Sequence, residues 1–141
     1  MTNNPQYFTL LELTFTSTGL SNTPATWEQV SSLRSLGLFL DGVRKQFGKP
    51  IRVNCAVRSP AVNSKVGGVS TSAHLKGMAA DICAWSGKEP DNRELLSVLE
   101  KSIGKIDQLI SYHVVAGDSS KNIRFIHVGL SESPRGQRLY K

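Results

Sequence analysis

The chain has 141 residues, of which 39% are hydrophobic and 20% are charged, and this size and composition fit one globular domain over residues 1–141 rather than two. Its longest apolar stretches fall far short of the roughly 18 residues that span a bilayer, so the sequence predicts no membrane span. Seventeen Lys and Arg against eleven Asp and Glu give a net charge of +6, and residues 101–141 alone hold seven basic and three acidic residues.

This basic excess suits an anionic surface, but the basic residues come singly and without interleaved aromatic residues, so we expect no nucleic-acid partner. The first residues, MTNNPQ, show neither the basic start nor the apolar core of a secretory signal, which predicts synthesis in the cytoplasm without a signal peptide. Cys55 and Cys83 lack CxxC spacing and are interpreted as small core residues, and the sequence leaves open whether they pair.

The first predicted element is an amphipathic helix over residues 26–48, because apolar residues recur there at spacings of three or four. Thr26 and Gln29 have the spacing of a capping box, and Gly48 followed by Pro50 gives a stop. A second helix is predicted from Asp91 to about residue 104.

Strands are predicted from alternating apolar residues in four segments, which are 51–57, 79–85, 106–115 and 123–130. In the first, alternation would put Ile51, Val53, Cys55 and Val57 on one face. In the last, it would put His127 on one face with Ile123 and Phe125. Because helices and strands do not alternate regularly, the pattern indicates a compact α+β domain. Residues 59–72 are predicted to form a loop, and residues 131–141 a loose basic tail.

Two of the three histidines lie where a metal site could use them. His74 precedes Asp81 by seven residues, with Gly77 between them to permit a tight bend, and His127 lies in a predicted strand. Two imidazoles and one carboxylate suit Zn²⁺ and leave a fourth position open, as in catalytic sites. On spacing alone, the alternative that these residues bind no metal stays open. Isolated HxxxxxxD pairs occur by chance, and a lone strand histidine is usually a half-buried core residue.

The surrounding residues, SAHLKGMAAD, reproduce the SxHxxGxAxD pattern of the zinc D-Ala-D-Ala carboxypeptidases, and the chain resembles this family from about residue 8 to 130. The segments FGKPIRVNCAVRSPAVNSKVGG upstream, and IDQLI and FIHVGL downstream, follow in the family's order. The resemblance implies a hedgehog/D,D-peptidase-like fold, which is a small antiparallel sheet with helices packed on it. The same architecture is shared by vancomycin-resistance dipeptidases, phage peptidoglycan endopeptidases and the hedgehog signalling domain.

The resemblance implies that His74, Asp81 and His127 are the zinc ligands. It also implies that Arg58 orients the substrate, with an ordinary ion-pairing arginine as the alternative. Ser72 would hydrogen-bond the substrate, or would simply cap a turn. Gln108 would orient a ligand or substrate, although a strand-end polar residue is the simpler account.

The sequence departs from the family where a carboxylate normally moves the proton, either three residues before the last histidine or at the end of the preceding strand. Those places hold Arg124 and Tyr112. Tyr112 could stabilise an oxyanion, and His113 has a suitable pKa but is expected to face the opposite way, so both are only candidate catalytic residues. Of two carboxylates elsewhere, Asp107 is interpreted as a strand-edge or turn residue and Glu12 as structural, so the general base is unassigned.

The expected function is that of a monomeric zinc peptidase of bacterial or phage origin that cuts peptidoglycan peptides, as a D-Ala-D-Ala carboxypeptidase or a cross-link endopeptidase. A wall substrate reached without a signal peptide suggests an endolysin-like phage product, released by a holin or packaged in the virion. The missing carboxylate keeps a second hypothesis open, a zinc-containing module that binds the cell wall without turnover. A third makes the zinc structural and the basic tail the functional surface.

Overall fold

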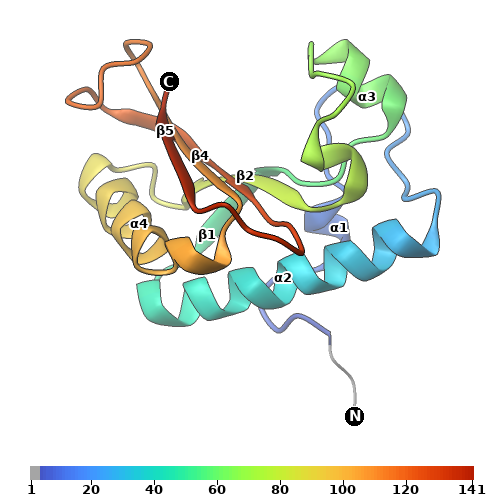
Figure 1. The fold of residues 1–141 in the computed structure, drawn as a ribbon, viewed down its shortest axis with the longest axis horizontal. Coiled ribbons are helices and arrows are strands. Elements are labelled where there is room, and N and C mark those ends of the chain that lie inside the picture. The colour runs from blue at the N-terminus through green and yellow to red at the C-terminus, as the bar shows by residue number, and fades with distance from the viewer. Residues whose placement is uncertain (1–3) are drawn as a thin grey trace.

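The computed structural model describes residues 4–141, so residues 1–3, which begin the segment without signal-sequence features, lie outside the description. The elements follow in the order α1 (Leu10–Leu13), α2 (Trp27–Phe47), β1 (Ile51–Cys55), α3 (Pro60–Lys65), η1 (Ala73–Lys76), β2 (Ala79–Ala84), α4 (Glu89–Lys101), η2 (Ile103–Lys105), β3 (Gln108–His113), β4 (Ile123–Gly129) and β5 (Gln137–Tyr140). Figure 1 shows α2 lying below the sheet, with α4 and α3 on opposite sides of the molecule. Among residues 4–141, no helix combines the length and hydrophobicity that crossing a bilayer requires.

Helix α2 begins and ends as the sequence predicts. The Thr26 side chain accepts a hydrogen bond from the backbone N–H of Gln29, whose side chain accepts one from the backbone N–H of Thr26 in return. Gly48 ends the helix in the left-handed conformation, with φ of 77°. An N-cap side chain such as Thr26 contributes about 1 kcal/mol of stability. Both ends of this helix are therefore determined by its own sequence.

Helix α4 begins earlier than predicted. It starts at Glu89 rather than Asp91, and its N-cap, Lys88, makes no side-chain capping hydrogen bond. Pro90 lies in the first turn, where its missing N–H costs nothing, and the Asp91 carboxylate instead accepts hydrogen bonds from Lys49 and Ser86.

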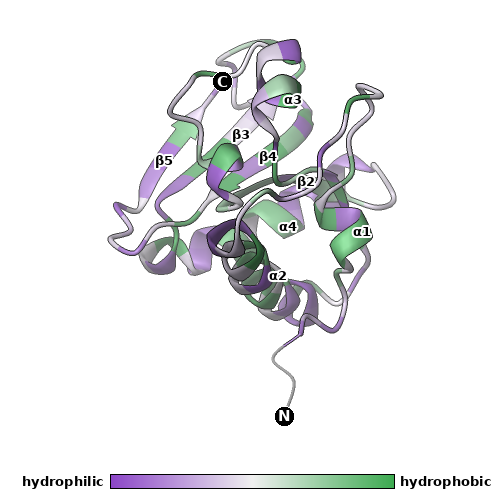
Figure 2. Cartoon of the chain, turned by 90° about the vertical axis from the view of Figure 1, so that its right-hand side faces the viewer, coloured by the Kyte–Doolittle hydropathy of each residue, from purple (hydrophilic) through white to green (hydrophobic). Residues whose placement is uncertain are grey.

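The five strands form one sheet in the order β1-β2-β4-β3-β5, with every pair antiparallel except β3 and β5, which are parallel. The sheet is therefore mixed rather than purely antiparallel. Residues 137–140, which we expected in a loose tail, form the edge strand β5 beside β3. Figure 2 shows that β5 is largely hydrophilic, so its residues lack the alternation of apolar and polar side chains from which strands were predicted.

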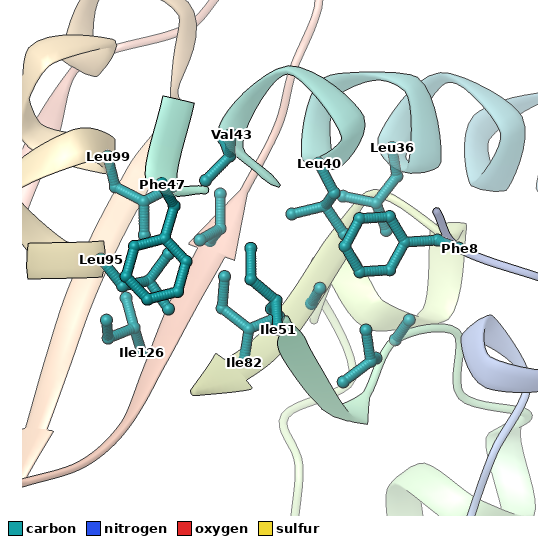
Figure 3. Packing of buried hydrophobic residues seen from close by; sticks show 14 of the residues in the cluster. Phe8, Leu36, Leu40, Val43, Phe47, Ile51, Ile82, Leu95, Leu99 and Ile126 are labelled. Atoms are coloured by element: carbon teal, nitrogen blue, oxygen red, sulfur yellow. The ribbon is translucent and has the colours of Figure 1, made fainter. Parts of the chain in front are cut away.

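The core lies between one face of the sheet and helices α2 and α4. Figure 3 shows Leu36, Leu40, Val43 and Phe47 of α2 packed with sheet residues and with Leu95 and Leu99 of α4. Leu36 and Leu40 are fully buried, and each such side chain contributes about 2 kcal/mol through the apolar surface it removes from water. Because this face is occupied by the core, functional side chains of the strands must lie on the opposite face.

Two irregularities in the sheet change which side chains face the core. The register shifts between Val53 and Cys55, so Cys55 pairs with Asp81 and does not share a face with Ile51 and Val53 as predicted. A second shift in the pairing of β3 with β4 places Ile123 in the core, away from the face that carries His127. The predicted loop over residues 59–72 contains the short helix α3.

Candidate functional site

His74 is fixed by the turn that carries it. It lies in η1, where the Ser72 hydroxyl accepts a hydrogen bond from the backbone N–H of His74 and Gly77 ends the turn with φ of 71°. The ring nitrogen Nδ1 lies 2.6 Å from the carbonyl oxygen of Ala56, so Nδ1–H donates to that carbonyl. The other ring nitrogen, Nε2, is left as the group that can act as a ligand.

Asp81 and His127 lie opposite each other in the pairing of β2 with β4. On β4, Ile126 and Val128 point into the core, so alternation turns His127 to the opposite face of the sheet. His127 Nδ1 lies 3.0 Å from Oδ1 of Asp81. The strand register therefore holds the second imidazole against the carboxylate.

The structure brings His74, Asp81 and His127 together, with one potential ligand atom from each within 4.8 Å of the others. Their side chains are only 3%, 13% and 14% exposed. His74 Nε2 lies 3.3 Å from Asp81 Oδ1 but makes no hydrogen bond, and it is the one buried side-chain nitrogen or oxygen of residues 4–141 without a hydrogen-bond partner. A buried imidazole nitrogen without a partner, beside a carboxylate and a second imidazole, is the donor set that Zn²⁺ prefers. The residues present therefore fit the ion.

The charges of the cluster are strongly coupled. Burial opposes the charge on His74, but the nearby Asp81 carboxylate and the Cys55 thiol outweigh it and raise the pKa of His74 to about 9. Burial likewise opposes the charge on Asp81, but the two histidines hold the pKa of that carboxyl far below its usual range. In the metal-free protein, the positive charge of protonated His74 thus balances the negative charge of the Asp81 carboxylate.

Arg58 contacts the candidate ligands rather than standing free in the site. Its Nη2 lies 3.4 Å from Asp81 Oδ2, its Nε 3.3 Å from Cys55 Sγ, and its Nη1 3.3 Å from the Asn63 side-chain oxygen. With a side chain 15% exposed, Arg58 still lines the groove described below. This geometry shows the ion-pairing role for Arg58, and its substrate role stays a prediction.

Two buried asparagines brace this arrangement, and sequence reasoning missed both. The Asn22 side chain donates to the carbonyl of Val57 and accepts from the N–H of Ser59, so it holds the backbone on either side of Arg58. The Asn63 side chain accepts from Arg58 and donates to the carbonyl of Val69. Neither asparagine lies in a recognisable spacing motif, so local pattern does not identify them.

The cluster opens into a groove of about 570 Å³. Its floor includes Gln108, Ile110 and Tyr112, which alternate along β3 on the face away from the core. The loop around Gly68 and Ser72 forms part of its wall. A groove of this size is in the range of ligand-binding sites. The three residues predicted to contact substrate, Arg58, Ser72 and Gln108, all line it.

Tyr112 lines the groove, whereas Arg124 and His113 are not among its lining residues. The Tyr112 ring stacks on Phe125, with ring centroids 4.4 Å apart. Burial and the negative charge of Asp81 raise the pKa of Tyr112, so near neutral pH it is a hydroxyl donor and not a base. Arg124 is exposed, and its guanidinium carbon lies over the Phe125 ring, 5.7 Å from the ring centroid.

His113, predicted as a weak catalytic candidate, is buried elsewhere. Its Nε2 lies 2.8 Å from the Ser111 hydroxyl and its Nδ1 2.7 Å from the carbonyl of Lys121, so both ring nitrogens are occupied. The expected opposite orientation of His113 and Tyr112 is confirmed, and His113 has no access to the groove. His113, whose ordinary pKa would suit proton transfer near neutral pH, is therefore not placed to carry the proton.

The other candidate carboxylates serve the fold. Asp107 forms an ion pair with Arg135 at 2.9 Å, which lowers the pKa of Asp107, and Glu12 completes the capping box of α1 with Thr9. The interpretation of both as structural agrees with these contacts, although Asp107 and Arg135 also lie at the groove.

The two cysteines differ from the prediction of small core residues. Both are free and only half-buried, because the register shift in β1 turns Cys55 toward Asp81 and Arg58 instead of the core. Burial would raise the pKa of the Cys55 thiol, but His74 and Arg58 outweigh this effect and lower the pKa. Cys55 is thus part of the surroundings of the candidate metal site.

The family model for peptidase M15 matches residues 6–116 of the chain. The chain belongs to the peptidase M15 family. This match covers Arg58, His74, Asp81 and Tyr112, and ends before His127, so the third candidate ligand rests on the geometry of the sheet. No curated protein matches the sequence. The chain is therefore an M15 metallopeptidase with His74, Asp81 and His127 as its candidate metal site.

Proposed function

We propose that the protein is a zinc-dependent peptidase that hydrolyses peptide bonds in the stem peptides of peptidoglycan, as a D-Ala-D-Ala carboxypeptidase or a cross-link endopeptidase. The observation that carries this proposal is the convergence of His74, Asp81 and His127 at a groove, with the buried His74 Nε2 lacking a hydrogen-bond partner. Membership of a peptidase family supports a peptide as the substrate.

His74 Nε2, Asp81 and His127 would hold the ion. Zinc in such a site supplies Lewis-acid polarisation of a carbonyl and lowers the pKa of water. Arg58 keeps the Asp81 carboxylate turned toward the two histidines, since it contacts only the Oδ2 oxygen. Ser72 fixes the turn that carries His74, so these side chains order the ligands before the substrate arrives.

Tyr112 is the residue at the groove with a hydroxyl donor near Asp81 and Arg58. Its O–H can donate to the oxygen of the scissile carbonyl as negative charge develops there, which is the role of an oxyanion-hole donor. Because the ring is stacked on Phe125, the hydroxyl is held in place with little loss of freedom on substrate binding.

The proposed site of action follows from the proposed substrate. Peptidoglycan lies outside the cytoplasmic membrane, so we infer action at the cell wall, by a phage lysis or virion protein or by a bacterial wall-remodelling enzyme. The net charge of +6 supports association with the anionic polymers of the wall. We propose that the protein works as a monomer, because all candidate ligands come from one chain.

One observation favours a second function, a zinc-containing module that binds wall peptides without turnover. The two positions where the resemblance places the family's carboxylate hold Tyr112 and Arg124, and the nearby Asp107 is engaged by Arg135. Loss of a general base typically lowers a hydrolytic rate by about 10² to 10⁴. The two functions therefore share the metal site and the groove, and differ in rate.

The deciding experiment incubates the zinc-loaded protein with purified muropeptides and detects released D-Ala and cleaved cross-links by mass spectrometry. A His74→Ala variant serves as the control, and zinc content per chain is measured for both proteins. Product from the wild type alone supports the peptidase. One zinc per chain with muropeptide binding and no product overturns the peptidase and supports the binding module.

A further inference from the structure

Gln108, which lines the groove beside the candidate metal site, is paired with a second glutamine, Gln137, on the neighbouring strand. Gln108 of β3 is in register with Gln137 of β5, and its Nε2 donates a hydrogen bond of 2.8 Å to the Gln137 side-chain oxygen. Gln108 is also in register with Gly129 of β4. Gln108 lies within residues 6–116, which the family model matches, whereas Gln137 lies beyond them, in the C-terminal strand β5.

Gly129 keeps the path between the metal site and this pair open. A Cβ at this position would lie 3.4 Å from His127 Nε2 and 3.8 Å from the Cβ of Gln108. These are ordinary van der Waals distances and the backbone has no positive φ, so the position would accept a side chain without strain. Glycine here therefore leaves room in the groove rather than relieving the backbone.

The pair leaves one acceptor and one donor unused. Within residues 4–141, the side-chain oxygen of Gln108 and the side-chain NH₂ of Gln137 have no further hydrogen-bond partner. One peptide bond carries the complementary groups, an N–H that can donate to Gln108 and a C=O that can accept from Gln137. The two side-chain amides can therefore accept a hydrogen bond from one peptide bond and donate a hydrogen bond to it.

A carboxylate would fit the same place poorly. It has no N–H to donate to Gln108, and it would meet the carboxylate of Asp107 next along the chain. The nearby cation, Arg135, already forms its ion pair with Asp107 through Nε and Nη2. An unpaired acceptor and a like charge both disfavour an anion.

We propose that Gln108 and Gln137 form a subsite that binds an internal peptide bond of the substrate and determines specificity for an extended peptide. This inference rests on the proposed function, since it concerns the substrate of the same groove. Gln108 lies two residues along β3 from Ile110, which pairs with His127, and two strand residues span roughly 7 Å. The bound peptide bond therefore lies about two residues of extended peptide from the bond at the metal.

The test uses the zinc-loaded full chain and a synthetic stem pentapeptide, with analogues that are each N-methylated at one backbone nitrogen. Methylation removes one N–H donor at a time. Dissociation constants are measured by NMR titration of the ¹⁵N-labelled protein, in which the side-chain amide signals of glutamines are observed directly. The same spectra report any hydrolysis of the peptide.

Methylation at one position is expected to weaken binding to the wild type about fivefold, the effect of one hydrogen bond. The Gln108→Leu variant should show no extra loss at that position, because it lacks the acceptor for the methylated N–H, and Gln108→Ala provides a second variant should the first fold poorly. Gln46→Leu, at an exposed position of α2, should keep the wild-type loss.

Equal losses in all variants at every position overturn the subsite. Coupling to Gln108 without hydrolysis keeps the subsite and overturns the peptidase. Hydrolysis without such coupling does the reverse, so the two proposals fail separately.

Discussion

Arg58 and Asp81 form an ion pair that uses only one of the two carboxylate oxygens. Arg58 Nη2 lies 3.4 Å from Oδ2, while Oδ1 lies 3.3 Å from His74 and 3.0 Å from His127. The carboxylate is thus divided between a cation on one side and two imidazoles on the other. Arg58 acts as a positioning residue for the candidate metal ligand, which explains why it is held by three partners.

The first prediction concerns this ion pair. An Arg58→Gln substitution frees the Asp81 carboxylate to rotate, so the affinity for zinc should fall about 10- to 100-fold, as for other residues that orient metal ligands. Competition with a fluorescent zinc chelator measures the affinity. Arg52→Gln removes an exposed arginine of β1, six residues before Arg58, and should leave zinc affinity unchanged. Wild-type affinity in the Arg58 variant, with the fold intact, would contradict the positioning role.

The second prediction restores the missing carboxylate. Tyr112→Glu places an acid at the groove, and if the protein is a peptidase limited by proton transfer, muropeptide hydrolysis should rise about 10²-fold or more. Arg124→Glu is the matched control, because Arg124 is exposed and does not line the groove. Mass spectrometry of the products gives both rates. A faster Arg124→Glu and an unchanged Tyr112→Glu would place the functional position at residue 124 instead.

The third prediction is the pH dependence of the metal-free protein. The pKa of His74 is raised from 6.5 to about 9 in the folded state, so its contribution to stability is complete below pH 6.5 and is lost as the pH rises through 9. The pKa of Asp81 is lowered, so its contribution is present above about pH 3.8 and is lost in acid. In chelator, the free energy of unfolding should therefore fall by on the order of 2–3 kcal/mol between pH 6 and pH 9.5.

Urea denaturation at a series of pH values measures this change. A His74→Gln variant lacks the titrating group, so its stability should vary much less over the same range. A wild-type stability that stays level or increases from pH 6 to pH 9.5 would show that the metal-free cluster does not hold a proton as described.

The fourth prediction compares two glycines. Gly77 has a φ of 71°, and a Cβ there would lie 3.0 Å from the carbonyl oxygen of Gln29, so Gly77→Ala should destabilise the protein by about 1–3 kcal/mol. Gly42, in α2, has nothing within 4 Å of an added Cβ, so Gly42→Ala should stabilise it by up to about 1 kcal/mol. Thermal unfolding of the two variants gives the sign of each change. A stabilising Gly77→Ala would contradict the tight turn at η1.

The sequence predicts best those elements whose ends and faces are set locally. Helix α2 has a capping box at Thr26 and a left-handed glycine at its end, and both are visible as residue types at fixed spacings. The strand β5 was missed because its position depends on pairing with β3, and its own residues show little alternation. Local pattern gives no information on a strand that is stabilised mainly by its neighbour.

The candidate site divides in the same way. His74, Asp81 and His127 could be named from a motif and a resemblance, and the structure brings the three together. The orientation of Cys55 could not be predicted, because it depends on an irregularity in the pairing of β1 with β2. The choice between Tyr112 and Arg124 likewise required the pairing of β3 with β4.

The candidate metal site can form only when β2 and β4 pair in their native register. A slip of β4 by one residue would turn His127 into the core and bring the apolar Ile126 opposite the carboxylate of Asp81. Such a misaligned sheet would turn Ile126 and Val128 out of the core and would offer only one imidazole to an ion. Zinc binding would therefore stabilise the native register of β2 and β4 relative to the register shifted by one residue. The ion would then contribute to the specificity of folding as well as to the chemistry.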